Sequence, residues 1–275
     1  MNFTKLPEGR RPLIVASHER SGTHFTMNTL ASCFDFISAP WVNFDHTSFN
    51  INYFASHAVA DLIRQLAAVR PANIIKTHHA FEFFAEALPR CGDEISVIYV
   101  YRHPADVLAS YWRFLHSWPW TEGPRCATVL EFATSEPMGR LMRLQYRQAP
   151  TMLDRWADHV QRWLDAAARS PSIHLVRYED LDGDFAATVD QLGEALGLRP
   201  SGLTRPSRSE NVVGHGRVPF EPVAGADNRW AVAELAMVRH RGLMARLGYG
   251  AALPSRAAPN GIEDQASVSA AITKV

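Results

Sequence analysis

Short apolar runs alternate with longer, helix-like stretches over the first two hundred residues. The runs are rich in β-branched and aromatic residues and almost free of charge, as is typical of strands covered on both faces. They span residues 12–16, 73–76, 95–101 and 173–176. Between them, apolar residues recur every three to four positions, which predicts helices. The helices are expected around residues 23–34, 104–114, 153–168, 184–196 and 230–247.

This alternation predicts a fold of the α/β class with three layers. A mostly parallel sheet should lie between helices on both faces, because parallel strands need crossover connections. One continuous domain over residues 1–253 fits better than two, and the Ala/Ser/Pro-rich residues 254–275 are expected to form a flexible tail. Residues 199–229 lack periodicity, which is typical of a lid, a binding loop or a disordered segment.

Composition and charge exclude several classes of function. With 47% hydrophobic and 20% charged residues, the chain has the composition of an ordinary globular protein. Because 28 basic residues balance 28 acidic ones, no broad basic surface for nucleic acid or an anionic membrane is expected. No stretch resembles a membrane span or the apolar core of a signal peptide, so a cytoplasmic protein is expected. The scattered Cys33, Cys91 and Cys126 are expected to be reduced packing residues.

A polar cluster follows each of the four apolar runs. Ligands of open α/β sheets bind beyond the carboxyl ends of the strands, so the four clusters should meet in one place. They are residues 20–23, residues 76–78, residues 102–104 with Ser110, and residues 177–180.

The first cluster has the ingredients of a P-loop-like strand-loop-helix that binds phosphate. Gly22 lets the backbone approach an anion, and the following helix presents its positive end. Arg20, Thr23 and His24 add donors. The patterns GxxxxGK[ST] and GxGxxG are absent, so neither a standard nucleotide triphosphatase nor a Rossmann dehydrogenase is supported. Taken alone, this cluster equally fits a helix capped by Ser21 or Thr23, with Arg20 in solvent.

Together the clusters resemble the sulfotransferase family that uses 3′-phosphoadenosine 5′-phosphosulfate (PAPS). Residues 17–25, Ser-His-Glu-Arg-Ser-Gly-Thr-His-Phe, resemble its 5′-phosphosulfate loop, usually Tyr-Pro-Lys-Ser-Gly-Thr-Thr-Trp. Residues 102–111 resemble its 3′-phosphate motif, Arg-x-Pro-x-Asp-x-x-x-Ser-Tyr. Lys76-Thr77-His78 matches the Lys-Thr-His that carries the catalytic histidine, and residues 178–180 match a later Tyr-Glu-Asp. Order and spacing agree over residues 12–185.

The resemblance implies transfer of a sulfuryl group from PAPS to a hydroxyl or amine of a small-molecule or natural-product acceptor. It implies PAP as the product and no metal. His78 would be the general base, and Lys76 and Arg20 would stabilise the charge that develops on the departing phosphate. The residues that it implies for donor binding are Arg20, Ser21, Gly22, Thr23, His24, Phe25, Arg102, Ser110, Tyr178 and Arg217.

The chain departs from the family pattern in two places. Arg20 stands where the family usually has lysine and Glu19 where it has proline; some branches, including tyrosylprotein sulfotransferases, use Arg-Ser-Gly-Thr, so we interpret the arginine as a subgroup mark. The later Arg-Lys-Gly-x-x-Gly-x-Trp segment has only a loose counterpart, in which Arg208 and Arg217 both compete for the 3′-phosphate. The neighbouring His79 is expected to support His78 or to lie at the surface.

Two other functions are weighed against this one. A small-molecule or nucleotide kinase would use the Arg20 loop for ATP, but the missing P-loop lysine argues against it. A non-catalytic nucleotide-binding protein on the same fold would not need the Lys76 and His78 that this chain keeps. The expected partner is a small-molecule acceptor rather than nucleic acid or a membrane, and the oligomeric state is open, with a homodimer as one alternative.

Overall fold

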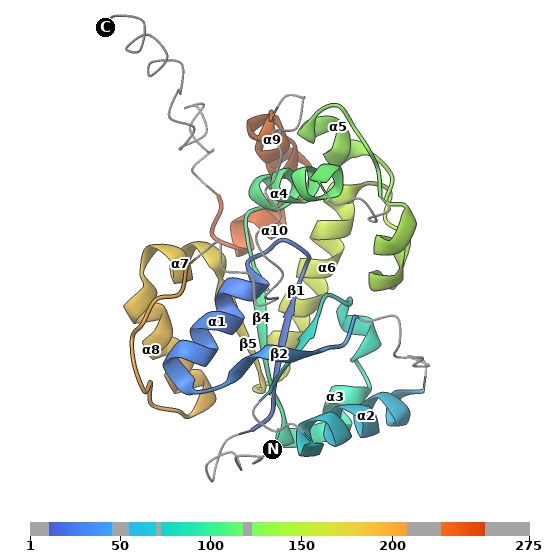
Figure 1. Cartoon of the computed structure of the whole chain (residues 1–275). Helices are drawn as coiled ribbons and strands as arrows, with labels where there is room; N and C mark the ends of the chain where they lie inside the picture. Colours follow the sequence, from blue (N-terminus) through green and yellow to red (C-terminus); the bar gives the residue numbers. More distant parts are fainter. Residues whose placement is uncertain (1–10, 46–54, 70–72, 118–122, 208–226, 251–275) are drawn as a thin grey trace, which may run out of the picture.

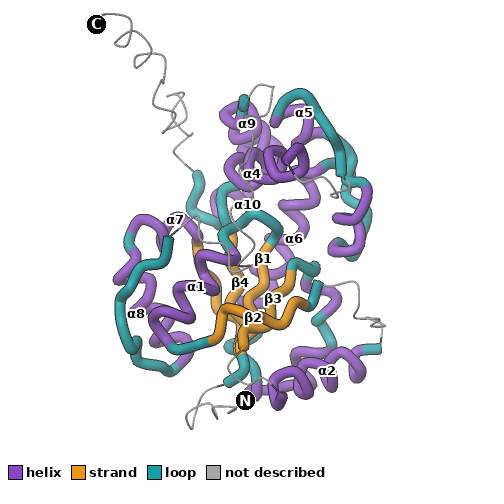
Figure 2. Tube along the Cα trace, in the orientation of Figure 1, coloured by secondary structure: helices purple, strands orange, loops and turns teal. Residues whose placement is uncertain are grey.

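Five parallel strands form one sheet in the order β2-β3-β1-β4-β5. The computed structural model of the chain describes residues 11–45, 55–69, 73–117, 123–207 and 227–250. Its strands are β1 (Leu13–Ser17), β2 (Ile37–Asn43), β3 (Asn73–Thr77), β4 (Ser96–Tyr101) and β5 (Ile173–Arg177). Figure 2 shows them at the centre of the molecule, with helices on either side.

The strand register brings the carboxyl ends of the three central strands side by side. Ser17 of β1 lies opposite Val100 of β4, and Ala16 lies opposite Thr77 of β3. The segments that follow these strands therefore leave the sheet at one edge. This edge is where three of the four polar clusters begin.

Helices cover both faces of the sheet (Figure 1). On one face, the apolar side chains of Leu13, Val15 and Ile98 pack with α1 (Thr23–Phe34), α7 (Tyr178–Gly183) and α8 (Phe185–Leu196). On the other face, the alternate side chains of the same strands, such as Ile14 and Val97, pack with the remaining helices. These are α2 (Ser56–Val69), α3 (Ala87–Cys91), α4 (Pro104–Ser117), α5 (Val129–Thr134), α6 (Met152–Ala167), α9 (Arg229–Arg239) and α10 (Arg241–Arg246). The predicted three-layer α/β fold is confirmed.

Short 3₁₀ helices complete the described part of the chain. They are η1 (Phe81–Phe83), η2 (Gly92–Glu94) and η3 (Gly139–Leu144). The first follows the Lys-Thr-His segment, so it fixes where the chain turns after β3.

The structure adds one strand and four α-helices to the predicted elements and divides one predicted helix. Strand β2 has Pro40 in it, which lacks a donor for the sheet ladder, and the strand lies at the sheet edge with a register shift between Ile37 and Val42. Helices α2, α3, α5 and α7 were not predicted either. The single helix predicted over residues 230–247 is wrong, because non-helical backbone angles at His240 separate α9 from α10.

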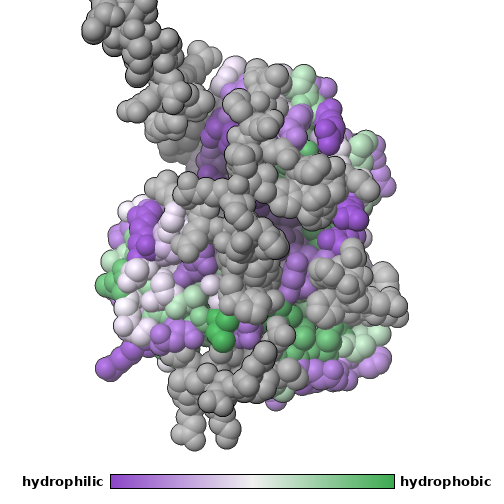
Figure 3. Space-filling model, in the orientation of Figure 1, coloured by the Kyte–Doolittle hydropathy of each residue, from purple (hydrophilic) through white to green (hydrophobic). Residues whose placement is uncertain are grey.

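The three cysteines are buried and free, as expected. No helix in the described part of the chain is long and apolar enough to cross a membrane. On the face seen in Figure 3, the described surface mixes hydrophilic residues with smaller hydrophobic areas. The predicted tail, residues 254–275, and most of the 199–229 segment lie outside the described residues.

Candidate active site

The loop between β1 and α1 has an unusual backbone. Arg20 has a φ of 67° and Gly22 a φ of 98°, so both lie in the left-handed region. Glycine adopts this conformation freely, whereas arginine must be held there by its surroundings. Gly22 precedes α1, and no side chain caps the helix. The alternative of a helix capped by Ser21 or Thr23 is therefore wrong.

Gly22 lies directly against the ring of Tyr178. A Cβ atom at this position would be 2.2 Å from Cδ2 of Tyr178, which is far inside the contact distance. The Tyr178 ring also meets Phe25 edge to face, with 6.0 Å between ring centroids. The first residue of α7 thus closes one side of the loop between β1 and α1.

Arg102, which follows β4, stacks on the same tyrosine. Its Cζ lies 4.3 Å from the Tyr178 ring centroid. Its Nε is buried and has no hydrogen-bond partner among the described residues, and the same holds for Oγ of the fully buried Ser21. Buried donors normally have partners, so two unmatched donors beside the loop fit an anion such as phosphate.

Arg20 reaches the helix that begins after Arg102. Its Nε donates a hydrogen bond of 3.2 Å to Oγ of Ser110, and its Cζ lies 4.8 Å from the Phe114 ring centroid. Burial, with Arg102 and Arg113 nearby, lowers the pKa of Arg20 to about 10, so it is still a cation at neutral pH. Ser110 therefore contacts Arg20, whereas the resemblance pairs Ser110 with Arg102.

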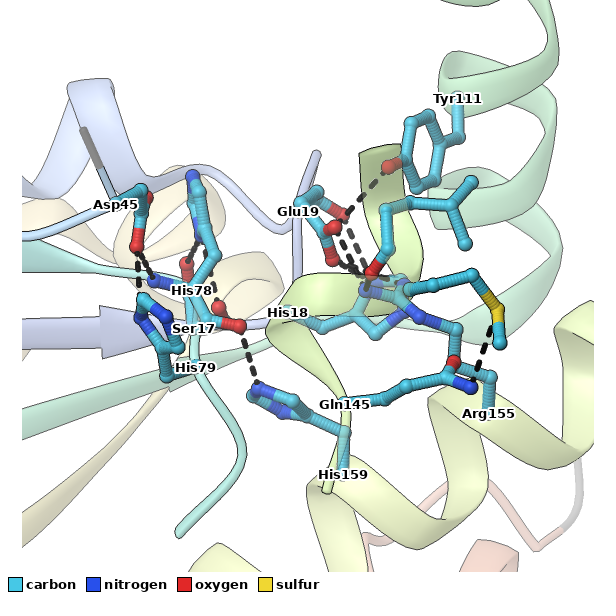
Figure 4. A network of polar contacts seen from close by, with 12 residues as sticks. Ser17, His18, Glu19, Asp45, His78, His79, Tyr111, Gln145, Arg155 and His159 are labelled. Carbon is cyan, nitrogen blue, oxygen red and sulfur yellow. Dashed lines mark hydrogen bonds and ion pairs between the residues drawn. The ribbon is translucent and has the colours of Figure 1, made fainter. Parts of the chain in front are cut away.

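His78 lies beside the loop as a neutral imidazole. Its Nδ1 is 2.9 Å from the carbonyl oxygen of Ser17 (Figure 4). A carbonyl only accepts, so Nδ1 carries the proton and Nε2 has a free lone pair. Burial and the charge of Lys76 lower the pKa of His78 to about 4. Oγ of Ser17 also contacts Oγ1 of Thr23 at 2.6 Å, which links this histidine to the start of α1.

Asp45, just after β2, organises the Lys-Thr-His segment. Its Oδ1 accepts from the backbone N–H of His78 at 2.7 Å and from Thr77 Oγ1 at 3.3 Å; its Oδ2 accepts from Lys76 Nζ at 3.0 Å. Burial alone would raise the pKa of Asp45, but Lys76, His78 and His79 hold it well below its usual range. The sequence did not point to Asp45, because Pro40 concealed the strand before it.

His79 is buried and faces Asp45 rather than the surface. Its Nδ1 lies 3.2 Å from Oδ1 of Asp45, and its ring meets Phe83 at 5.0 Å between centroids. This position agrees with the prediction that His79 supports His78 and not with the alternative that it lies at the surface.

The other predicted donor-binding residues differ in their surroundings. Burial and the charges of Lys76, His78 and Arg20 lower the pKa of His24 to about 3, so it is neutral. Phe25 is 3% exposed and packs against Phe185. Both competing arginines of the 199–229 segment, Arg208 and Arg217, lie outside the described residues.

Glu179 joins the Tyr-Glu-Asp segment to the arginine motif. Its Oε1 accepts from the backbone N–H of His103 at 2.9 Å, and its Oε2 accepts from Tyr249 Oη at 3.0 Å. The sequence identified Glu179 only as part of the match to the Tyr-Glu-Asp motif. The structure therefore brings all four polar clusters together: cations and unmatched donors lie next to an imidazole that can accept a proton.

Comparisons with known proteins identify the family of the chain. The family model for the sulfotransferase domain matches residues 10–215. Human Sulfotransferase 4A1 is 31% identical over 138 residues, which are 50% of this chain and 42% of that protein. Cytosolic sulfotransferase 17 of Arabidopsis thaliana is 26% identical over 142 residues, covering 51% of this chain and 36% of that protein. The chain spans less than half the length of these curated relatives.

A solved sulfotransferase from Alicyclobacillus acidocaldarius is 15% identical and covers 87% of this chain and 96% of that one, with a TM-score of 0.48. The family assignment rests on the family model, which covers more than half of the chain. The chain belongs to the sulfotransferase family.

Proposed function

We propose that the chain transfers a sulfuryl group from PAPS to a hydroxyl or amine of a small-molecule acceptor. The observation that carries this proposal is the position of the His78 ring. Its Nδ1 donates a hydrogen bond of 2.9 Å to the carbonyl oxygen of Ser17, the last residue of the strand before the loop, and its Nε2 keeps a free lone pair. A proton acceptor and an anion site next to each other are what in-line group transfer needs.

In the proposed step, the acceptor oxygen or nitrogen forms a bond to sulfur while the bond between sulfur and the bridging phosphate oxygen breaks. The electron pair of that bond stays on the phosphate of PAP, and the acceptor proton moves to Nε2 of His78. Since Nδ1 already donates to Ser17, the imidazolium that forms keeps this hydrogen bond. Asp45 holds the backbone of His78 at 2.7 Å, so the ring stays in place as it changes charge.

Fixed positive charge would stabilise the departing phosphate. Arg20 belongs to the loop and Arg102 follows β4, and each has its guanidinium over an aromatic ring. Lys76 Nζ gives one hydrogen bond to Asp45, and an ammonium group has three donors, so it can still contact an anion. Such preorganised charge acts most strongly where water is excluded.

The donor would bind along the four clusters. We assign the 5′-phosphosulfate to Arg20, Ser21, Gly22, Thr23 and His24, because Ser21 offers an unmatched buried donor. We assign the 3′-phosphate to Arg102 and Ser110, with a contribution from Arg217 or its competitor Arg208. Phe25 and Tyr178 would lie against the adenine, since their rings meet beside the loop.

The acceptor is proposed to be a discrete small molecule. The chain has a formal net charge of zero, which offers no broad attraction to a polyanionic acceptor such as a sulfated polymer. The proposed step also uses no metal, so an excess of chelator should leave the rate unchanged.

Calorimetry with PAP, ATP and NAD, followed by an acceptor panel with sulfur-labelled PAPS, tests the proposal. We expect PAP to bind far more tightly than ATP or NAD and label to reach at least one acceptor. Phosphate transfer from ATP with Mg²⁺ would identify a kinase instead. PAP binding without transfer to any acceptor would identify a non-catalytic binding protein.

A further inference from the structure

A buried ion pair ties the phosphate loop to α6. Arg155 is 2% exposed and Glu19 7%, and two parallel hydrogen bonds join them. Nη2 of Arg155 donates to Oε1 at 2.7 Å, and Nη1 donates to Oε2 at 3.0 Å (Figure 4). This two-pronged geometry fixes the carboxylate in direction as well as distance.

Arg155 holds a second residue of the same loop. Its Nη1 lies 2.8 Å from Nε2 of His18, which must accept because a guanidinium only donates. The other ring nitrogen, Nδ1, then donates to the carbonyl oxygen of Glu19 at 2.9 Å. Burial lowers the pKa of His18 to about 4, in keeping with a neutral ring. One arginine thus fixes two consecutive residues just before Arg20.

The Glu19 carboxylate also reaches α4. Its Oε1 accepts from Oη of Tyr111 at 3.0 Å, and the residue before Tyr111 is Ser110, which binds Arg20. Glu19 therefore links the loop, α4 and α6 next to the left-handed Arg20. A non-glycine residue persists in that conformation only where its surroundings impose it.

The next turn of α6 holds the other part of the site. His159, four residues after Arg155, donates from Nε2 to the carbonyl oxygen of His78 at 3.2 Å, while its Nδ1 accepts from Oη of Tyr99 at 2.9 Å. One face of α6 therefore contacts both the segment that carries the proposed base and the loop that carries Arg20.

We propose that the Glu19–Arg155 pair is a positioning device that keeps Arg20 in its left-handed conformation, with its guanidinium between Ser110 and Phe114. Neither partner belongs to the proposed donor-binding or proton-transfer machinery. Buried ion pairs are weak contributors to stability, so a pair at this place is better explained by geometry than by folding energy. The inference rests on the proposed sulfuryl transfer.

The test is whether Glu19 acts through Arg20. We would measure kcat, KM for PAPS and the Kd of PAP for Glu19→Gln, Arg20→Ala and the variant with both changes. Misplacement of Arg20 should lower kcat by about a hundredfold in Glu19→Gln, with KM changed by only a few fold. In the Arg20→Ala background the same change should have almost no further effect, because there is no guanidinium left to misplace.

Two further variants keep the test decisive. Arg155→Lys retains the buried charge but loses the bidentate geometry, so it should fold and show the same loss of kcat as expected for Glu19→Gln. It replaces Glu19→Gln in the test if that variant fails to fold. Arg162→Gln removes a 38% exposed arginine of α6 that pairs with Glu82 and Asp158, and it should leave kcat unchanged.

The inference would be overturned if Glu19→Gln lowered kcat by the same factor in the wild-type chain and in the Arg20→Ala background. It would also be overturned if Glu19→Gln and Arg155→Lys both kept the wild-type kcat. If the wild-type chain binds PAP and transfers sulfate, these outcomes overturn the positioning role alone. If the wild-type chain does neither, the proposed function fails first and the inference fails with it.

Discussion

The two halves of the candidate active site differ in how completely their polar groups are bonded. We call Arg20, Ser21, Arg102, Ser110 and Tyr178 the donor half, and Asp45, Lys76, Thr77, His78 and His79 the base half. In the donor half, Ser21 Oγ and Arg102 Nε are buried without a hydrogen-bond partner among the described residues. In the base half, Asp45 alone joins four groups of the Lys-Thr-His-His segment.

This difference separates two tasks. Unmatched donors suit an anion that arrives and departs, because such an anion can satisfy them each time it binds. An imidazole whose Nδ1 is already bonded suits proton transfer, because its tautomer and orientation must be set when the acceptor attacks. The two halves should therefore respond differently to substitution.

The largest effect is expected from His78→Ala. Loss of a general base lowers rates by about 10²- to 10⁴-fold, so transfer of labelled sulfate should fall by about a thousandfold. The Kd of PAP, measured by calorimetry, should stay within a few fold of the wild-type value, because the donor half is intact. Near-normal turnover would remove His78 as the base.

A smaller effect of the opposite kind is expected from Arg102→Ala. A hydrogen bond to a charged group contributes about 1.5–3 kcal/mol, so the Kd of PAP should rise by about 10- to 100-fold. Arg102→Lys keeps the charge but loses the planar guanidinium, so its Kd for PAP should lie between those of Arg102→Ala and the wild type. An unchanged Kd in Arg102→Ala would refute the assignment of Arg102 to the 3′-phosphate.

Asp45→Asn should affect the base half more mildly. The side-chain oxygen can still accept from the backbone of His78, but the negative charge that raises the pKa of His78 is gone. His78 becomes a weaker base, and we expect kcat to fall by about tenfold with little change in the Kd of PAP. A loss of PAP affinity larger than the loss of kcat would show that Asp45 serves the donor half instead.

The pH dependence of the wild-type chain gives the smallest and sharpest signal. Since the pKa of His78 is lowered to about 4, kcat/KM should change less than about twofold between pH 7 and pH 5.5. If the base were a histidine with an ordinary pKa, it would become protonated and kcat/KM would fall near pH 6.5. A midpoint near pH 6.5 would contradict the lowered pKa of the partly buried His78.

Stability has to be followed in the same range. His18, His24 and His78 all have lowered pKa values, so the unfolded chain takes up their protons first as pH falls below about 6.5. The free energy of unfolding should therefore decrease from that pH toward pH 4. Denaturant titrations at each pH measure this loss of stability, so that it can be distinguished from a loss of kcat/KM caused by protonation of His78.

The fold and the motif-bearing loops could be predicted from the sequence because their signals are local. An apolar run followed by Arg-Ser-Gly-Thr or by Lys-Thr-His defines both a strand and the chemistry at its end. Strand β2 could not be predicted, since Pro40 is unfavourable in a strand and is tolerated here only at the sheet edge. The carboxylate of Asp45 was missed with it.

Contacts between distant segments were missed for a different reason. The sequence identified Glu19 only as a departure from the family pattern. Its partner, Arg155, lies 136 residues further along the chain, on a helix whose periodicity was predicted but whose buried arginine was not. Local patterns carry no information about such pairs. They became visible only when the packing of α6 against the loop was known.

Single-turnover transfer from sulfur-labelled PAPS, measured for His78→Ala and Arg102→Ala over a wide range of PAPS concentration, tests the division of tasks most directly. The rate of Arg102→Ala should approach within about tenfold of the wild-type rate as PAPS saturates the site, whereas His78→Ala should stay slow at every concentration. Equal recovery of both variants at saturation, or equal failure of both, would contradict the assignment of binding to one half and proton transfer to the other.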